Sequence, residues 1–464
     1  MADRPRYTET LAAFCAQLRY EDLPQDVVHR AKLCLLDSVG VMLAGATTEI
    51  GKRTLDAALR FEPQGAATAI GSVHAVSPPA ASLVNGSLLE IFEMQDGWRL
   101  GNVHPCVVIA AALSVAEWQR APGRDVLAAI VAGYEVVNRL SWTMVPRHLA
   151  RGFLPTGTAG TCGSAVAAGC LLGLDPVRMT QALGVSAFIL PVSTAENLWE
   201  GYSIKPLHAG YAARQGVEAA LLARDGFEGC PIEGSADHGR GVLEITTGDV
   251  DFTRLTEQLG KYFTIRDVYF KAIPACRHVH GTAEAVRNAV TNRKVNPEDV
   301  AAIRVHTYTL SATRLNRYPA PGGTAIAAQF SIPYAAAAAL ADRALGMAQF
   351  RDDRVRDPML LDLARKVTVH VDPQIDALYP DVTPTRVEIV LRSGETLASR
   401  VDTPKGDPRA PLTDAELAAK FGETASMALD VDTVSRLQDI LMRFDEVEDV
   451  HAALAPMRKA LSRN

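Results

Sequence analysis

The segment most informative for chemistry runs from residue 81 to 105, with the sequence ASLVNGSLLEIFEMQDGWRLGNVHP. Within it, His104 follows two carboxylates, Glu93 and Asp96. If the two acids are helical, their three-residue spacing places both on one helix face. Acid–base chemistry uses such groupings because neighbouring charges push the pKa values of their members apart. A helix end followed by a solvated loop is the structural alternative.

Two further segments gather lysine and histidine. Residues 200–216, EGYSIKPLHAGYAARQG, place Lys205 and His208 before a helix of small residues. Residues 270–281, FKAIPACRHVHG, contain Lys271, Cys276, Arg277, His278 and His280. Three such groupings in a chain with 11 histidines suggest one shared site, and their spacing leaves open whether they meet.

The composition is that of an ordinary globular protein, with 48% apolar and 22% charged residues. Its 464 residues are enough for two or three domains. The formal charge of −6 argues against a general nucleic-acid binder, which usually carries a basic excess. The longest apolar runs, 106–113 and 334–341, are too short to span a bilayer. We therefore expect neither a nucleic-acid partner nor a membrane.

The cysteines and the N-terminal segment bear on the cellular compartment. The segment MADRPRYTETLAAF lacks the apolar core of a signal peptide. Seven cysteines without a CxxC pair, an odd number, favour reduced thiols over a disulfide framework. Both observations predict a cytoplasmic protein.

The arrangement along the chain predicts two kinds of structure. Up to about residue 260, Ala and Gly recur at three- and four-residue spacing, as in residues 31–46 and 158–174, which indicates a closely packed helical bundle. Residues 301–310 and 366–372 alternate like half-buried strands, and 385–401 form a hairpin turning at Ser393-Gly394. Helical patterns resume from Pro411. We expect a mainly α fold, with an all-helical domain of residues 1–265 and 408–464 and an inserted α+β domain at 266–407.

Six segments in order resemble the MmgE/PrpD family over nearly the whole chain. They are LLDSVGVMLAGA, LVNGSLLEIFEMQDG with the later HP, GFLPTGTAGTCGSAVAAGCLLGLD, IKPLHAGYAARQGVEAALLARDGFEG, FKAIPACRHVHGTAEA and AAQFSIPYAAA. The resemblance implies a helical main domain, an inserted α+β lid, an active site in the cleft between them and usually a homodimer. It also implies no metal and no organic cofactor. Family members include 2-methylcitrate dehydratase, cis-aconitate decarboxylase and iminodisuccinate epimerase.

The resemblance assigns individual positions. His104 matches the histidine of the family's HP pair, and Lys205 matches the lysine of its K-x-L-H motif. The remaining matches are Lys271 opening the third motif, Asp96 as the last acid of a DFDD-like run, Glu93 at its start, and Tyr334 after the FS pair.

Four positions depart from the family pattern. Gln95 and Gly97 flank Asp96 where an acid and Thr or Val are frequent. Leu154 stands where many dehydratase- and decarboxylase-like members carry histidine. Cys276 stands where the animal cis-aconitate decarboxylase has a catalytic histidine, although many bacterial members also carry cysteine. These departures put a two-histidine proton relay, and that enzyme's substrate, in question.

The family's reactions share the removal or delivery of a proton at carbon next to a carboxylate. Preorganised cations and donors must hold the enolate-like charge that develops. We predict that His104 is the acid or base, with Asp96 or Glu93 orienting its ring. The predicted catalytic residues are His104, Lys205, Asp96, Lys271 and Cys276. The predicted binding residues for a small polycarboxylate are Glu93, His208, Arg277, His280 and Tyr334.

Several of these residues have structural alternatives. Cys276 is either a buried small hydrophobe or a nucleophile with a depressed pKa. His280 is favoured over His278 as the histidine that faces the site, on the view that the two alternate along extended chain. Tyr334 could instead be a core residue with a satisfied hydroxyl. The segment PAPGGT, residues 319–324, predicts a mobile loop near the cleft.

Four functional hypotheses remain open at this point. The first is a cofactor-independent lyase, dehydrating or decarboxylating a small di- or tricarboxylate. The second is an epimerase or isomerase of an α-substituted dicarboxylate, which gains weight from Leu154 because a leaving hydroxyl needs an acid. The third is a metal-dependent hydrolase using His278, His280 and His104, although no carboxylate spacing completes its ligand set. The fourth is an inactive relative that binds polycarboxylates.

Overall fold

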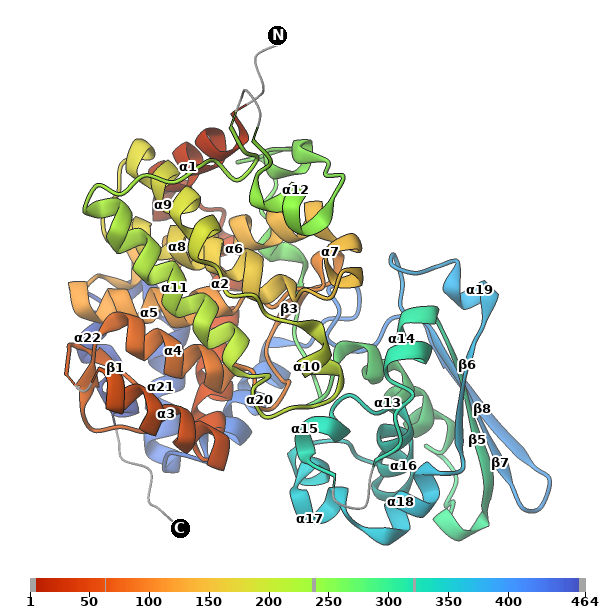
Figure 1. Cartoon of the computed structure of the whole chain (residues 1–464). Helices are drawn as coiled ribbons and strands as arrows, with labels where there is room; N and C mark the ends of the chain where they lie inside the picture. Colours follow the sequence, from red (N-terminus) through yellow and green to blue (C-terminus); the bar gives the residue numbers. More distant parts are fainter. Residues whose placement is uncertain (1–5, 63, 236–238, 320–322, 459–464) are drawn as a thin grey trace.

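The computed structural model describes residues 6–62, 64–235, 239–319 and 323–458. Within these ranges the chain is mainly α-helical, which confirms the predicted fold class. Figure 1 shows a larger body of helices beside a smaller body that contains a sheet. Residues 320–322 of the segment predicted as a mobile loop lie outside the described residues.

The larger body contains the helices of the first half of the chain. They are α1 (Tyr7–Gln17), α2 (Gln25–Ala46), α3 (Glu49–Phe61), α4 (Pro78–Leu89), α5 (Val107–Gln119), α6 (Gly123–Met144), α7 (Arg147–Ala150), α8 (Pro155–Leu171), α9 (Pro176–Ile189), α10 (Ala195–Trp199), α11 (Leu207–Arg224) and α12 (Val242–Thr247). Helix α8 packs against α5, α6, α9 and α11. Helices α8 and α6 approach closely at Gly163, where an added Cβ would meet Val137 and the backbone of Gly133.

Two short antiparallel pairs accompany these helices. Strand β1 (Ala67–Thr68) pairs with β2 (Ala75–Val76), and β3 (Gly97–Trp98) pairs with β4 (Val268–Tyr269). The second pair joins the segment after α4 to the segment before Lys271, two of the three stretches that sequence analysis singled out.

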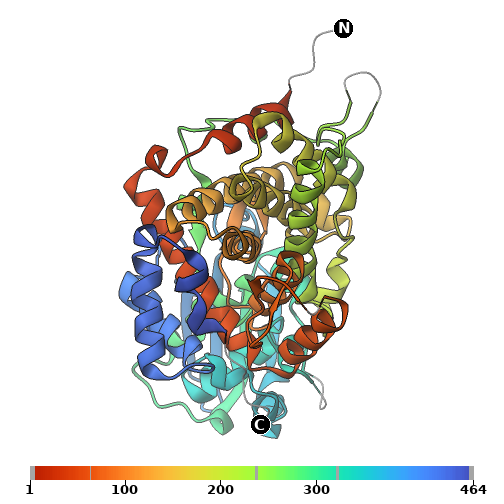
Figure 2. The same ribbon diagram turned by 90° about the vertical axis from the view of Figure 1, so that its left-hand side faces the viewer.

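The end of the chain returns to the larger body. Helices α20 (Asp414–Ala425) and α21 (Val431–Met442) pack on α2, and α22 (Val450–Ala453) packs on α5. Figure 2 shows these blue C-terminal helices lying alongside the red N-terminal ones. Leu417, Phe421 and Leu437 belong to the same hydrophobic core as the first helices. The C-terminal segment therefore completes the core that the N-terminal half begins.

The smaller body has its own hydrophobic core around a four-stranded sheet. Its elements are α13 (Arg277–Ala289), β5 (Val300–Thr307), α14 (Thr309–Arg314), α15 (Ala325–Ala328), α16 (Ile332–Asp342), α17 (Asp352–Val355), α18 (Pro358–Ala364), β6 (Val367–Val371), α19 (Pro373–Asp376), β7 (Thr385–Leu391) and β8 (Thr396–Val401). The strand order is β6-β5-β7-β8, with β5 parallel to β6 and the other pairs antiparallel. Strands therefore form at all the places where alternation predicted them. The division into domains at residues 265 and 408 stays a prediction.

The core of the smaller body extends into the larger one. Leu154, Leu198 and Trp199 belong to the larger body by sequence, yet they pack with Phe330 and its neighbours. The ring of Trp199 meets that of Phe330 edge-on, with the ring centroids 6.3 Å apart. This apolar contact sets the distance between the two bodies next to the site.

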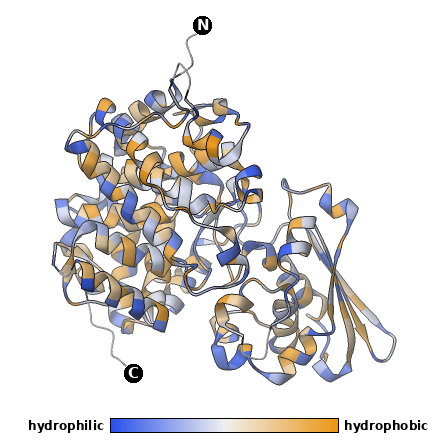
Figure 3. Ribbon diagram, in the orientation of Figure 1, coloured by the Kyte–Doolittle hydropathy of each residue, from blue (hydrophilic) through white to orange (hydrophobic). Residues whose placement is uncertain are grey.

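Hydropathy follows the same arrangement. Figure 3 shows hydrophobic residues along the central helices and hydrophilic residues at many of the outer turns. Among the described residues, no single helix combines the length and apolarity needed to cross a membrane. The bent pair α2 and α3, with an 89° break, meets that test by length and composition only.

Candidate active site

The three segments singled out from the sequence meet in one buried cluster. Lys205 Nζ lies 2.7 Å from Glu90 Oε2 and is also paired with Glu93. Lys271 Nζ lies 2.6 Å from Glu93 Oε1. His104 Nδ1 lies 2.7 Å from Glu90 Oε1. Two carboxylates, two ammonium groups and an imidazole therefore form one connected network.

Close packing of α4 and α11 brings this cluster together. A Cβ added at Gly210 would meet the backbone of Leu83 and the side chain of Ser87, so the helices touch backbone to backbone. Glu90 stands at the end of α4, and Lys205 precedes α11. Small residues at the contact thus let a lysine reach a carboxylate 115 positions earlier in the chain.

Glu90 is the site residue that sequence analysis missed. Its side chain is fully buried at the C-terminal cap of α4. One oxygen faces His104, the other faces Lys205, and its backbone carbonyl accepts a further hydrogen bond from Lys205 at 3.0 Å. A lone acid inside the apolar run LVNGSLLEIF was the available signal, because a buried carboxylate needs a charged partner.

Glu93 and Asp96 lie outside helix α4, so the condition under which they would share one helix face is not met, and the alternative of a helix end followed by a loop holds. Helix α4 ends at Leu89, and Glu93 adopts a left-handed conformation with φ 51°. The turn sends Glu93 towards the lysines and Asp96 to the opposite side. There Asp96 accepts hydrogen bonds from Tyr134 Oη at 2.7 Å and from the backbone N–H of Cys106 at 3.2 Å.

His104 is therefore oriented by Glu90, and not by Asp96 or Glu93 as predicted from the sequence, since the nearer oxygen of Glu93 lies 3.9 Å from Nε2. Gln95 Nε2 lies 2.8 Å from the same Nδ1 atom, which places one of the departures from the family pattern in direct contact with the imidazole. On the other side of the ring, Nε2 lies 3.5 Å from Lys271 Nζ. Because a carboxylate accepts from Nδ1–H, Nε2 keeps its lone pair, and that lone pair faces the Lys271 ammonium.

Charge pairing keeps both glutamates ionised. Burial alone would raise the pKa of Glu90, but His104 and Lys205 outweigh it and hold that pKa well below its usual range. In the same way, Lys205 and Lys271 overcome burial and lower the pKa of Glu93 to about 2. Burial would lower the pKa of Lys205, yet Glu90 and Glu93 raise it above its ordinary value. The site therefore holds fixed opposite charges at neutral pH.

His208 lies next to this network as a neutral group. Burial lowers its pKa, although Glu90 acts in the opposite direction. Its Nδ1 atom donates to the backbone carbonyl of Lys205. Its predicted substrate-binding role is compatible with its place, because it lines a hollow of about 190 Å³ together with Lys205 and Leu154.

A second, smaller pocket of about 60 Å³ opens onto the cluster between the two bodies. Its polar lining residues are Glu93, Asn102, His104, Tyr269, Cys276, Arg277 and His278, and its apolar lining residues are Leu149, Leu154, Pro155, Leu198, Trp199 and Phe330. We call it the cleft pocket. Leu154 lines both the cleft pocket and the neighbouring hollow, so its side chain separates the two spaces.

The structure reverses the predicted roles of the two histidines of the third segment. His278 and His280 lie in the first turn of α13 and not on extended chain. His278 lines the cleft pocket, and its Nδ1 lies 2.6 Å from the hydroxyl of Tyr308. His280 is buried with Nε2 3.1 Å from the carbonyl of Ala275, so it supports the start of its own helix.

Arg277 and Cys276 both line the cleft pocket, and each has a contact or a pKa shift that bears on its predicted role. Arg277 donates to the carbonyls of Pro404 and Lys405 and lies 3.4 Å from Asp407. Burial, reinforced by Glu93, raises the pKa of the Cys276 thiol to about 12. That direction is opposite to the one a nucleophilic thiolate needs.

Tyr334 does not reach the site. It is fully buried in α16, packs beside Phe350 and donates its hydroxyl to the carbonyl of Gln349. The structure therefore supports the alternative of a core tyrosine, because the surrounding helices enclose its ring and a backbone oxygen satisfies its hydroxyl.

Among the described residues, Glu90, His104 and His208 have ligand atoms within 4.8 Å of one another, as metal ligands do. The Lys205 ammonium is already on the Glu90 carboxylate, so a metal ion there would have to displace it. The metal-ligand set suggested from the sequence, His278 and His280 with His104, is not assembled. His278 contacts the hydroxyl of Tyr308 and His280 contacts the carbonyl of Ala275 instead. The expectation that the protein needs no metal stays a prediction.

Comparison with known proteins places the chain in a family. Residues 9–255 match the MmgE/PrpD N-terminal domain, and residues 273–446 match the MmgE/PrpD C-terminal domain. Cis-aconitate decarboxylases of Mus musculus and Homo sapiens are each 29% identical to the chain, covering 95% of it and 91% and 92% of their own lengths. That of Aspergillus terreus is 26% identical, covering 96% of the chain and 95% of its own length. Both domain matches together span most of the sequence, so the chain belongs to the MmgE/PrpD family.

Proposed function

We propose that the protein is a cofactor-independent lyase that moves a proton at a carbon conjugated to a carboxylate of a small di- or tricarboxylate. The observation that carries the proposal is the Glu90–His104 pair, with Nε2 of the imidazole facing Lys271. Support for the lyase class comes from the similarity to cis-aconitate decarboxylases over nearly the whole chain.

His104 acts as the proton carrier in this proposal. The ionised Glu90 carboxylate accepts from Nδ1–H, which fixes the tautomer and stabilises the imidazolium that forms when Nε2 takes a proton. Lys271 supplies positive charge to the enolate-like intermediate. Lys205 holds the two glutamates in place and keeps them ionised.

Within the lyase class, the pocket favours decarboxylation over dehydration. In decarboxylation the bond to the departing carboxylate breaks, CO₂ leaves, and the electron pair passes into the conjugated system of a remaining carboxylate. Protonated His104 then delivers its proton to carbon. Dehydration would require an acid at the leaving hydroxyl, and the apolar side chain of Leu154, which lines the pocket, cannot supply one. The neutral Cys276 thiol, with its pKa raised to about 12, is a weak acid for that task.

The test is proton NMR of the purified protein in D₂O with citrate, 2-methylcitrate, cis-aconitate, malates, tartrates and iminodisuccinate. We expect deuterium at carbon and an alkene product with loss of CO₂. His104→Gln should lower the rate by about 10²–10⁴-fold, as for other removed acid–base groups. His370→Gln, on the exposed strand β6, is the matched control and should leave the rate unchanged.

The other outcomes identify the alternatives. Deuterium with inversion and no CO₂ would favour the epimerase, and loss of activity with EDTA would favour a metal-dependent enzyme. If His104→Gln kept the wild-type rate, the assignment of the proton carrier would be wrong. Binding of the panel without any proton exchange would indicate an inactive relative.

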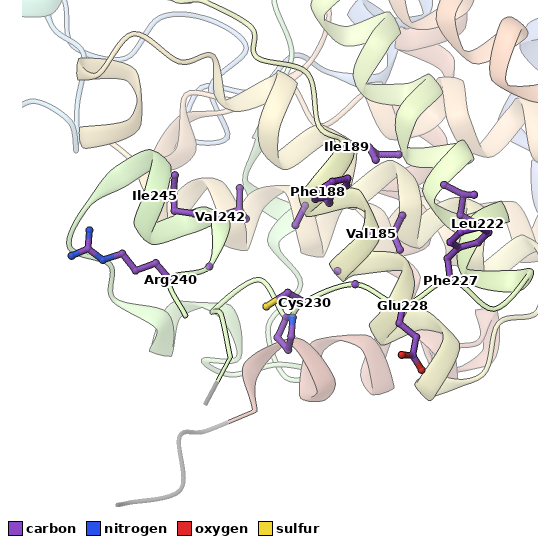
Figure 4. Close-up of a pocket in the computed structure, with 15 residues that line it drawn as sticks. Val185, Phe188, Ile189, Leu222, Phe227, Glu228, Cys230, Arg240, Val242 and Ile245 are labelled. Carbon is purple, nitrogen blue, oxygen red and sulfur yellow. The ribbon is translucent and has the colours of Figure 1, made fainter. Parts of the chain in front are cut away.

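We also propose that two copies of the chain associate through the face formed by α9, α11 and α12. Phe188 is 89% exposed there, and Phe227 and Ile245 are 60% and 59% exposed. Figure 4 shows these side chains around a hollow of about 620 Å³. Exposed apolar patches of this kind are typical of protein interfaces. Light scattering of wild type and Phe188→Glu tests the proposal, which fails if the wild type is a monomer.

A further inference from the structure

We infer that the cleft pocket selects an alkyl-substituted dicarboxylate and discriminates against a tricarboxylate. The inference rests on the proposed function, because it concerns the substrate of the same site. It follows from the number of hydrogen-bond donors that remain unused on the buried cations and from the apolar residues that line the same pocket.

Lys205 has no hydrogen-bond donor to offer a substrate. An ammonium group carries three donors. The contacts of Lys205 are the Glu90 carbonyl, Glu90 Oε2 and Glu93 Oε2, which use all three. Its charge contributes to the field of the site, but a substrate carboxylate would have to break one of these buried contacts to bind it.

Two cations retain capacity for a carboxylate. Lys271 is fully buried against Glu93 and His104, two residues that line the pocket, and these contacts leave one of its donors. Arg277 lines the pocket and shares its carboxylate partner, Asp407, with Arg409. Because Asp407 is shared, the guanidinium of Arg277 keeps positive charge to spare. One substrate carboxylate at Lys271 and a second at Arg277 would use this capacity.

Among the described residues of this cluster, the other cations are engaged. Lys205 is paired with Glu90 and Glu93, and Arg409 is paired with Asp407. A third substrate carboxylate would therefore enter a buried site without a cation of its own. Burial of an unpaired carboxylate is strongly unfavourable, because the group loses its hydration without compensation.

The remaining wall of the pocket is apolar. Its residues are Leu149, Leu154, Pro155, Leu198, Trp199 and Phe330. Of their side chains, only the indole of Trp199 carries a hydrogen-bond donor. Leu154, Leu198, Trp199 and Phe330 are each less than a tenth exposed. An alkyl group gains free energy by leaving water for such a surface, whereas a carboxylate loses it.

Leu154 occupies the position that decides this preference. It lies between the cleft pocket and the hollow beside Lys205 and His208, immediately before α8. Because Leu154 lines both spaces, a cationic or hydrogen-bonding side chain at this position would add a partner for a third carboxylate to a mainly apolar set of lining residues. We assign Leu154 as a specificity-determining residue on this ground.

A matched pair of ligands tests the inference directly. Cis-aconitate and 2-ethylmaleate share a cis-butenedioate core and differ only in a terminal carboxylate that becomes a methyl group. Calorimetric titration of the wild-type protein should show 2-ethylmaleate binding at least about tenfold more tightly, which corresponds to about 1.4 kcal/mol. Leu154→His should narrow or reverse the preference, and Leu154→Met is the control that should preserve it.

Three results would overturn the inference. One is equal or tighter binding of cis-aconitate to the wild type, and another is failure of both ligands to bind at about 10 mM, far weaker than the range in which specific sites operate. The third is an unchanged preference in a folded Leu154→His variant. Should that variant not fold, the wild-type comparison still decides.

The same samples separate this inference from the proposed function. In D₂O, the methylene protons of 2-ethylmaleate are conjugated to a carboxylate through the double bond, so His104 should exchange them for deuterium. Tight binding of 2-ethylmaleate without exchange would uphold the substrate preference and contradict the proposed chemistry. Faster exchange and tighter binding with cis-aconitate would uphold the chemistry and contradict the preference.

Discussion

Glu93 and Asp96 are three residues apart and equally buried, yet their carboxyl groups lie in opposite environments. Lys205 and Lys271 surround Glu93 and lower its pKa to about 2 against the effect of burial. Asp96 has neutral hydrogen-bond partners in Tyr134 and Cys106, so burial prevails and raises its pKa to about 7. The comparison teaches that the partners supplied by distant segments set the ionisation of a buried acid, and depth of burial does not.

The two sides of this loop have different consequences for function. The Glu93 side carries fixed charges that can hold a substrate and an anionic intermediate. On the Asp96 side, hydrogen bonds hold the loop against two helices. Cys106 is the N-cap residue of α5, and Tyr134 lies within α6. The left-handed backbone conformation of Glu93 thus separates the charged groups of the site from the hydrogen bonds that support the loop.

The largest effect should come from removing the cation of the charged side. Lys205→Met leaves Glu90 and Glu93 buried without their shared partner, so we expect a loss of about 3–5 kcal/mol in the free energy of unfolding. Proton exchange should also fall by about 10²–10³-fold, as for other electrostatic groups in active sites. Denaturant unfolding and NMR in D₂O measure both. Lys294→Met, at an exposed lysine, is the control, and near-wild-type values for Lys205→Met would contradict the network.

The protonation of Asp96 should affect the pH dependence of the free energy of unfolding. The folded protein keeps the Asp96 proton up to about pH 7, whereas the unfolded chain releases it near pH 3.9. Folding is therefore favoured at low pH, and this contribution is lost as pH rises from about 4 to 7. In the Asp96→Asn variant this loss does not occur. The free energy of unfolding of the variant, relative to that of wild type, should therefore rise by about 2–3 kcal/mol between pH 5 and pH 8. A pH-independent difference would show that Asp96 is already ionised at pH 5.

Cys276 sharpens the comparison, because its thiol is neutral although it lines the same pocket as the charged Glu93. Burial and Glu93 keep its thiol protonated, with a pKa of about 12. Cys276→Ser should therefore cost less than the roughly 10²-fold that marks the loss of an acid–base group. Steady-state rates with the best substrate of the panel decide this. Complete inactivation, together with alkylation of the wild-type thiol at neutral pH, would restore the nucleophile hypothesis.

The smallest effect is expected at Tyr334, which belongs to neither side of the loop. Tyr334→Phe removes its hydrogen bond to the Gln349 carbonyl and should lower the free energy of unfolding by about 1 kcal/mol. The exchange rate should stay at the wild-type value. A lower rate in a stably folded variant would return Tyr334 to the list of substrate-binding residues.

Much of the fold was accessible from the sequence. Alternation located the strands at 300–307, 367–371 and 385–401, and small-residue spacing located the packed helices, because both patterns arise from which side of a local element is buried. The motifs also identified His104, Lys205 and Lys271, which do meet in one cluster. The sequence patterns failed for Glu90 and for the roles of His278 and His280, and they left open whether Glu93 and Asp96 share a helix face. Each failure concerned the exact end of a helix or the first turn of one.

The sequence alone determined the mainly helical architecture, the family, and the segments that carry the charged residues. Only the tertiary structure decided which carboxylate pairs with which cation, and therefore which acid is ionised. Local periodicity reports the burial of neighbouring residues, since it depends on contacts a few positions apart. The pKa of a buried group depends instead on charges within a few ångströms, and for Glu93 these come from lysines 112 and 178 positions along the chain.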